Sequence, residues 1–163
     1  MHIKILLAGD GGQGIQSLSG IICRAAFANG LFVSHIPNYG LEQRGGVSLA
    51  YVQISDREVS YPKFSDPDLL LIMSEQASQR TREYRAKSGK VIDFTKYEKI
   101  ISENKIDYSS RNIFFLGLIT KVLVIRGFME KDCVFEALKE KLAKKSNWEN
   151  NIKAFETGFQ IGV

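Results

Sequence analysis

Cysteine and histidine are scarce in this chain of 163 residues, which holds two of each. Cys23 and Cys133 stand far apart, and neither belongs to a Cys-x-x-Cys pair. Zinc and iron–sulfur sites usually draw on such pairs, so we expect this chain alone to bind no metal. His2 and His35 have no second ligand or nucleophile at a recognisable spacing, so we interpret both as structural.

Long apolar runs are also missing. The longest, near residues 113–125, is interrupted by Thr120 and Lys121 and is shorter than the ~20 residues that cross a membrane. We therefore expect no membrane span. No cleavable leader precedes the first apolar strand, which makes the cytoplasm the expected location. A single Arg-Gly-Gly triplet, without repetition or flanking aromatic residues, gives no nucleic-acid signal.

The composition, 44% hydrophobic and 25% charged, fits one globular domain over residues 1–163. The formal net charge is only +4, but cations are concentrated in two segments. We consider either a solvated helix face or a docking patch for an acidic partner. The two segments carry Arg80, Arg82, Arg85, Lys87 and Lys90, and Lys139, Lys141, Lys144 and Lys145.

Glycine is concentrated directly after the first apolar run, where Gly9, Gly11, Gly12 and Gly14 fall within six residues before a helical pattern. Such a turn serves either as close packing in an α/β crossover or as an anion cradle at a helix start. Gln13 can donate to a ligand or a partner. Asp10 would repel a phosphate, so in a cradle the backbone N–H groups must do the binding.

The spacing Gly9-x-Gly11-x-x-Gly14 also matches the dinucleotide-binding pattern, which predicts NAD or FAD. That pattern requires an acidic residue at the end of the second strand, yet residues 31–36 end without one, and Glu42 lies beyond Pro37. No Gly-Lys-Ser/Thr follows to make a nucleotide P-loop. A freestanding NAD- or FAD-binding oxidoreductase therefore remains the alternative function.

The rest of the chain alternates strand and helix patterns, which predicts a three-layer α/β/α domain with a mostly parallel sheet. The first strand, helix and second strand form a Rossmann-like unit with a right-handed crossover. We predict a β-hairpin in which residues 47–54 turn back through residues 58–61. Further strands are expected at 68–73 and 90–94, and helices at 75–85, 111–126, 130–145 and 148–158.

Helix ends are predicted from capping residues. Asn29 and Gly30 should stop the first helix, and Ser74 should cap the helix that starts at residue 75. Asn147 and Gly158 should begin and end the last one.

The loop Pro-Asn-Tyr-Gly-Leu-Glu-Gln-Arg-Gly-Gly at 37–46 holds further candidate binding residues. Arg44 can make bidentate hydrogen bonds to a phosphate or to a carboxylate of a partner, and the adjacent Gly45 and Gly46 give the backbone conformational freedom. Its alternative is a local ion pair with Glu42. Tyr39 can pack on a partner or an adenine, or cover the surface.

Several motifs in one order resemble the γ subunit of 2-oxoacid:ferredoxin oxidoreductases over essentially the whole chain. They are GDGGQGI at 9–15, RAAFANG at 24–30, YGLEQRGG at 39–46, SDREV at 55–59, SDPDLLL at 65–71, Asn112, the Leu116-Gly117 pair, and Asn-x-x-Ala-Phe-x-x-Gly at 151–158.

The resemblance implies a chain that is inactive alone, contains no catalytic residue, and works with α, β and δ subunits and with ferredoxin or another acceptor. It implies that the other subunits hold thiamine diphosphate, magnesium and the iron–sulfur clusters, and that this chain lies on the coenzyme A side of the reaction. A third hypothesis is a docking module that binds no ligand.

Overall fold

Five strands form one mixed sheet in the order β2-β3-β1-β4-β5 in the computed structural model, which describes residues 1–39 and 46–162. Their bounds are β1 His2–Asp10, β2 Phe32–Asn38, β3 Val47–Ser55, β4 Leu69–Ile72 and β5 Lys90–Asp93. Within these described residues, β3 runs opposite to the other four strands, because it pairs antiparallel with both β1 and β2 while β4 and β5 pair parallel. The predicted α/β class is confirmed, with a mixed sheet.

The central strand β1 shows why this sheet is covered on both faces. Its side chains alternate, so that Ile5 and Leu7 enter one hydrophobic cluster while Leu6 and Ala8 enter another. A strand that buries both faces needs a nearly continuous apolar sequence, which β1 and β4 have.

The crossover from β1 to β2 differs from the usual Rossmann unit. β2 runs parallel to β1 but does not neighbour it, because β3 is inserted between them and pairs along its length with both. The predicted hairpin is therefore wrong: residues 58–61 form no strand. Both edges of β3 are already occupied, so no hydrogen-bonding edge is left for a returning strand.

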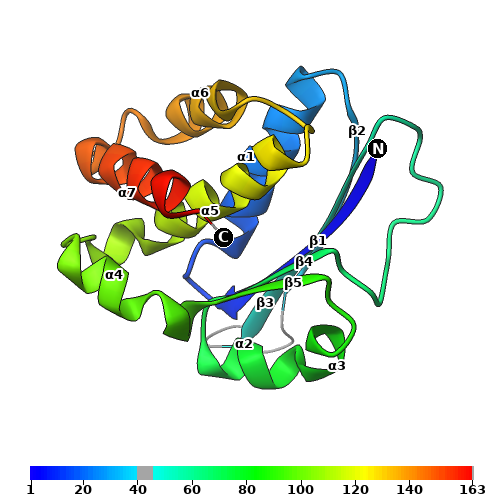
Figure 1. Cartoon of the computed structure of the whole chain (residues 1–163), viewed down its shortest axis with the longest axis horizontal. Coiled ribbons are helices and arrows are strands. Elements are labelled where there is room, and N and C mark those ends of the chain that lie inside the picture. The colour runs from blue at the N-terminus through cyan, green and yellow to red at the C-terminus, as the bar shows by residue number, and fades with distance from the viewer. Residues whose placement is uncertain (40–45, 163) are drawn as a thin grey trace.

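Helices cover the two faces unequally (Figure 1). One face carries α1 (Ile15–Ala28), α5 (Arg111–Ile125), α6 (Lys131–Leu142) and α7 (Trp148–Ile161), and the other carries the short α2 (Glu75–Arg80) and α3 (Arg82–Arg85). The predicted strand at 90–94 ends at Asp93, and residues 95–110, for which the sequence predicted no element, hold most of η1 (Phe94–Lys96) and all of α4 (Glu98–Glu103) and η2 (Tyr108–Ser110).

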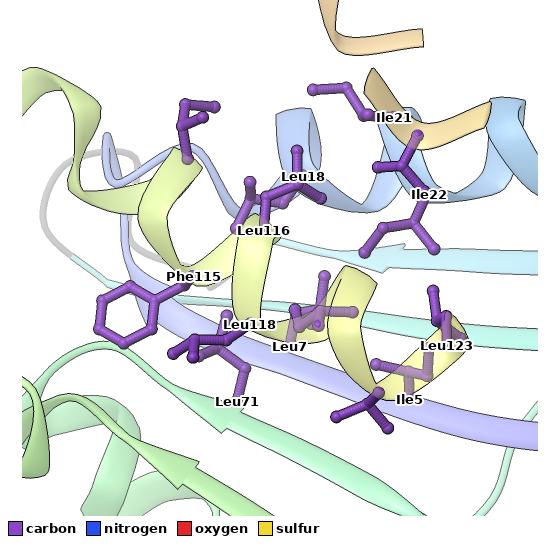
Figure 2. Packing of buried hydrophobic residues seen from close by; sticks show 14 of the residues in the cluster. Ile5, Leu7, Leu18, Ile21, Ile22, Leu71, Phe115, Leu116, Leu118 and Leu123 are labelled. Atoms are coloured by element: carbon purple, nitrogen blue, oxygen red, sulfur yellow. The ribbon is translucent and has the colours of Figure 1, made fainter. Parts of the chain in front are cut away.

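Helix α5 fills the centre of the larger core. Figure 2 shows Leu116, Leu118 and Leu123 lying between the sheet residues Ile5, Leu7 and Leu71 and side chains of α1. The stretch Tyr108–Ile125 has the length and mean hydropathy, 1.3, of a membrane span, but 61% of it is buried inside the domain. Burial on most sides explains its apolar character, since a core helix needs it as much as a membrane helix does.

Helices α5 and α7 pack backbone against backbone through two glycines. A Cβ on Gly117 would collide with the main chain of Phe155, and a Cβ on Gly158 would collide with the carbonyl of Phe114. The prediction that Gly158 stops the last helix is therefore wrong, because α7 continues to Ile161 and uses this glycine for close approach.

The other predicted caps lie at helix ends. The Oγ of Ser74 accepts a 3.0 Å hydrogen bond from the Ala77 N–H, and Asn29 ends α1 beside Gly30 at φ 78°, so both predictions are confirmed. Asn147 occupies the N-cap position of α7, so the predicted start of this helix is confirmed, although its side chain accepts no capping hydrogen bond within the described residues. Its side-chain amide donates instead to Ser109 Oγ at 3.4 Å.

Candidate functional site

The carboxyl ends of β1, β4 and β5 meet at one edge of the sheet (Figure 1). From this edge α1 leaves toward one face and α2 toward the other. Ligands of open α/β sheets bind at such a point, where consecutive connections leave in opposite directions. A cavity of about 110 Å³ lies here, with the glycine turn on one side and the start of α5 on the other.

Hydrogen bonds within the protein fix the shape of the glycine turn. The N–H of Asp10 donates to Gln13 Oε1 at 2.7 Å, and Gln13 Nε2 donates to the Met73 carbonyl at 3.2 Å. The N–H of Gly11 donates to the carbonyl of Gly46 at 2.9 Å. Gln13 thus links the ends of β1 and β4, whereas the sequence had indicated a donor to a ligand or a partner.

The carboxylate of Asp10 accepts a hydrogen bond from the residue that caps α2. Ser74 Oγ donates a 2.6 Å hydrogen bond to Asp10 Oδ1 while it caps α2. This contact joins the last residue of β1 to the N-cap residue of α2 at the switch point. The carboxylate is therefore engaged with the protein at the base of the turn.

The glycines of the turn serve different purposes. A Cβ on Gly9 would lie 2.8 Å from Gln13 Oε1, and a Cβ on Gly14 would overlap the side-chain amide of Asn112. Both positions are glycine because the packing is close. Gly12 differs, since its φ of 90° requires a glycine-like backbone while a Cβ there would have no atom within 4 Å. Gly12 therefore presents bare backbone to the cavity.

The opposite wall comes from residues that the sequence analysis did not select for the site. Arg111 and Asn112 begin α5, and the Arg111 guanidinium lies 5.2 Å from the ring centroid of Tyr108. Glu98 of α4 lies across from them, and the apolar lining comes from Phe94, Ile101 and Phe115. These residues could have been found from their position in the sequence: residues 94–112 come directly after β5, the third strand to end at this edge of the sheet.

The loop residues predicted for the site are only partly described. Tyr39 follows β2 and is 68% exposed, and Gly46 contacts the glycine turn through its carbonyl. Arg44 and Gly45 lie outside the described residues. The bond between Gly11 and Gly46 brings the end of this loop to the turn.

The sheet order argues against a dinucleotide site. In that fold the acidic residue at the end of the second strand reaches the ribose because the second strand neighbours the first. Here β3 lies between them, so the end of β2 is about 10 Å from β1, two strand spacings away. Neither the sequence nor the position of the end of β2 fits a contact with the ribose of a dinucleotide.

At the end of β5 a buried carboxylate stabilises the local structure. Asp93 Oδ1 accepts hydrogen bonds from the Thr95 N–H and hydroxyl at 3.2 and 2.8 Å, and Oδ2 pairs with Arg85 at 2.9 Å. Burial raises its pKa, but the bonds from Thr95 and the Arg85 charge outweigh burial and leave the pKa below its usual value. Asp93 therefore stays ionised.

The titratable side chains that line the cavity stand apart from one another. Within residues 1–39 and 46–162, its titratable side chains Glu98, Tyr108 and Arg111 make no hydrogen bond or ion pair with one another. General acid–base catalysis requires groups within hydrogen-bond reach. The described residues also contain no cluster of three His, Cys, Asp or Glu side chains that would hold a metal.

Comparison with known proteins gives end-to-end matches. Residues 4–93, just over half of the chain, match the family model described as pyruvate ferredoxin/flavodoxin oxidoreductase. The chain is 31% identical over 185 residues to the 2-oxoglutarate synthase subunit KorC of Methanothermobacter marburgensis, a match that covers 99% of this chain and 97% of that one.

Two solved structures share the fold. The γ subunit of a keto/oxoacid ferredoxin oxidoreductase from Geobacter sulfurreducens has a TM-score of 0.71 at 23% identity, covering 97% of this chain and 96% of that one. Part of the 2-oxoglutarate:ferredoxin oxidoreductase from Magnetococcus marinus gives 0.83 at 21% identity, covering 98% of this chain and 31% of that one. The curated relatives do not support the freestanding NAD or FAD enzyme. By its family model, its full-length relative and its fold, the chain belongs to the pyruvate ferredoxin/flavodoxin oxidoreductase family, as a subunit of the γ type.

Proposed function

We propose that this γ-type chain works inside a multi-subunit 2-oxoacid:ferredoxin oxidoreductase that converts a 2-oxoacid to its acyl-coenzyme A thioester. The single observation that carries the proposal is the match to a KorC subunit over 99% of this chain. We propose α, β and δ subunits as partners and ferredoxin or another acceptor as the electron sink. Thiamine diphosphate, magnesium and the iron–sulfur clusters then belong to the partners, and the complex is cytoplasmic.

The chain's own residues support a role without catalysis of the carbon chemistry. Its cysteines, Cys23 and Cys133, are both unpaired thiols on different helices, which suits a protein that holds no cluster. The cavity at the switch point is lined by one cation, Arg111, one carboxylate, Glu98, and a mixture of polar and apolar side chains. Such a site binds part of a ligand or a side chain of a neighbouring subunit.

For the substrate, the name of the KorC relative makes 2-oxoglutarate the first 2-oxoacid to test. Pyruvate, branched-chain 2-oxoacids and indolepyruvate are the comparison substrates, because the substrate pocket belongs to other subunits in this proposal.

For the cavity, we propose contact with a phosphate-bearing part of coenzyme A. The contact residues are Gly9, Gly11, Gly12, Gln13, Gly14, Tyr39, Arg44, Gly45 and Gly46. Support comes from the open backbone at Gly12 and from the amino end of the 14-residue helix α1, which no side chain of the described residues caps. Unpaired N–H groups and the helix dipole favour an anion at that place.

Copurification tests the complex. A tagged copy of the chain expressed in its source cells should bring down a thiamine-binding subunit and a cluster-bearing subunit. The eluate should reduce ferredoxin with 2-oxoglutarate and coenzyme A, and the chain alone should not. Full activity from the isolated chain would contradict the proposal.

The coenzyme A contact is tested in the same complex with Arg44→Ala. We expect a higher apparent KM for coenzyme A and an unchanged decarboxylation half-reaction without it. Arg126→Ala is the matched control, because Arg126 ends α5 at its other end. An unchanged KM in Arg44→Ala would assign Arg44 to its pair with Glu42 or to subunit contact.

A further inference from the structure

The face of the sheet covered by α2 and α3, called the α2 face below, is thinly covered. Its buried cluster holds seven residues, whereas the cluster on the other face holds 34. Among the described residues its only helices are α2, with six residues, and α3, with four, and Phe64 of the irregular segment 56–68 packs against the same cluster. Sheets of this class usually have full helical layers on both faces. The thin layer leaves room for another protein to complete the cover.

One of the two cationic segments of the chain lies on this face. Residues 80–90 contain five cations and one carboxylate, a net charge of +4 that equals the formal net charge of all 163 residues. Arg85 is neutralised by Asp93. Arg80, Arg82 and Lys87 are exposed and make no ion pair with any other described residue.

An exposed aromatic side chain lies on the same face. Tyr61 is 77% exposed, next to the exposed Lys63 in sequence. Phe64, from the same segment, packs edge-on against Tyr51 of β3, with ring centroids 5.4 Å apart. The Tyr51 hydroxyl lies 2.8 Å from the Tyr84 hydroxyl of α3. Tyr51 therefore connects the aromatic segment to the helix that carries the cations.

Hydrogen bonds hold the irregular segment in place. Gln53 Nε2, which is buried, donates to the Tyr61 carbonyl at 2.8 Å. The Lys4 ammonium pairs with Asp66 at 2.6 Å, and the Lys4 N–H donates to Asp68 Oδ2 at 2.7 Å. A surface already fixed in its binding conformation loses little entropy on association.

We propose that the α2 face docks onto an acidic surface of another subunit of the complex, with Arg80, Arg82 and Lys87 as its charges and Tyr61 as its aromatic anchor. This inference rests on the proposed function. Arginine and tyrosine are enriched where protein interfaces gain most of their binding energy. Unpaired cations steer an acidic surface into contact and fix its orientation.

A protein fits this face better than a polyanion. Glu75 and Glu83 are exposed on α2 and α3, among the cations. Evenly spaced phosphates of a nucleic acid or a lipid surface would be repelled at those carboxylates, whereas a protein can present a cation or a polar group opposite each one.

The test uses the complex with Arg80→Glu/Arg82→Glu. Its matched control is Lys144→Glu/Lys145→Glu, which makes the same charge change at two exposed lysines after α6. We expect the first variant to assemble at least about tenfold more slowly at low salt, with a weaker dependence of the rate on salt, and the control to match the wild type. Equal rates and equal salt dependence for all three proteins would overturn the inference.

Two further measurements separate the outcomes. Tyr61→Ser should raise the dissociation rate of the complex, and amides of residues 80–87 should exchange more slowly in the complex than in the free chain. If Tyr61→Ser dissociates at the wild-type rate and the amides of residues 80–87 exchange equally fast in the complex and in the free chain, the docking surface is overturned even though the complex forms. If the wild-type chain copurifies with no partner, the proposed function fails instead.

A polyanion is tested directly. The free chain is mixed at low salt with a 20-nucleotide DNA duplex and with phosphatidylserine vesicles. Binding that Arg80→Glu/Arg82→Glu abolishes, together with normal assembly of that variant, would reassign the surface to a polyanion and overturn the inference. Circular dichroism and thermal unfolding verify that each variant is folded.

Discussion

Gly158 of α7 lies against the main-chain carbonyl of Phe114 in α5, with no space between them for a side chain. Gly117 of α5 lies against Phe155 in the same way, so each helix contributes one glycine to the contact. This double contact fixes the distance between the two helices. Because α5 also lines the cavity through Arg111, Asn112 and Phe115, the contact determines the position of one wall of the site.

Gly158→Ala should therefore destabilise the domain. Alanine favours a helix by about 1 kcal/mol over glycine, but overpacking costs about 1–3 kcal/mol or more where the backbone must move. The matched control is Gly20→Ala in α1, where the new Cβ would lie 3.6 Å from the flexible end of Lys141. Urea unfolding should show a lower midpoint for Gly158→Ala and an unchanged or higher one for Gly20→Ala. The opposite order would show that the helices tolerate a wider separation.

Ser74→Ala should destabilise the junction of β4 and α2 by about 1–2 kcal/mol, because one hydroxyl both caps the helix and donates to Asp10. Thr157→Ala is the control, since the Thr157 hydroxyl donates only within α7 on an exposed surface. Chemical unfolding measures the difference. Equal stability of the two variants would mean that the bond to Asp10 contributes nothing.

The stability contribution of Asp93 should depend on pH in a defined direction. Its folded pKa lies below the usual value, so its ionised form stabilises the fold. That contribution is complete above the ordinary aspartate pKa near 3.9 and is lost as pH falls through the lower folded pKa. Asp93→Asn should cost about 1–2 kcal/mol of unfolding free energy at pH 7. The difference from wild type should shrink below about pH 4. A constant difference from pH 7 to pH 3 would contradict the role of the charge.

Cys23 should resist alkylation in the folded chain. Burial raises the pKa of its thiol to about 12, so at pH 8 almost none of it is the reactive thiolate. Iodoacetamide labelling followed by peptide mass spectrometry should show slow modification at Cys23 that becomes fast in urea. Cys133 is half-buried, and its thiol donates a 3.6 Å hydrogen bond to Asn29 Oδ1; it serves as the internal reference. Rapid modification of Cys23 without urea would show that α1 opens locally.

Local sequence was enough to predict most individual elements. The apolar alternation of β1 and the fully apolar β4 indicate buried strands, and Ser74 and Gly30 mark helix ends through side-chain or backbone preferences of a single residue. These features depend on contacts within a few residues, so they can be inferred without knowing the fold. The resemblance across ordered motifs then identified the family.

Strand pairing and contacts between helices could not be predicted from local sequence. The prediction that residues 58–61 form a returning strand was wrong because β1 and β2 already pair with both edges of β3. The prediction that the last helix ends at Gly158 was wrong because that glycine packs against a helix about 40 residues earlier in the chain. Glycine permits both a helix end and a close contact, and only the partner decides which occurs.

The amino-acid sequence by itself determined the glycine turn, the strand and helix types and the family, because each follows from residue preferences at short range. The tertiary structure decided what surrounds that turn. It inserted β3 between β1 and β2, brought Asn112 onto Gly14 and left the α2 face thinly covered. The physical reason is that burial and hydrogen bonding must be satisfied for the whole sheet at once, and residues distant in the chain compete for the same edges and faces.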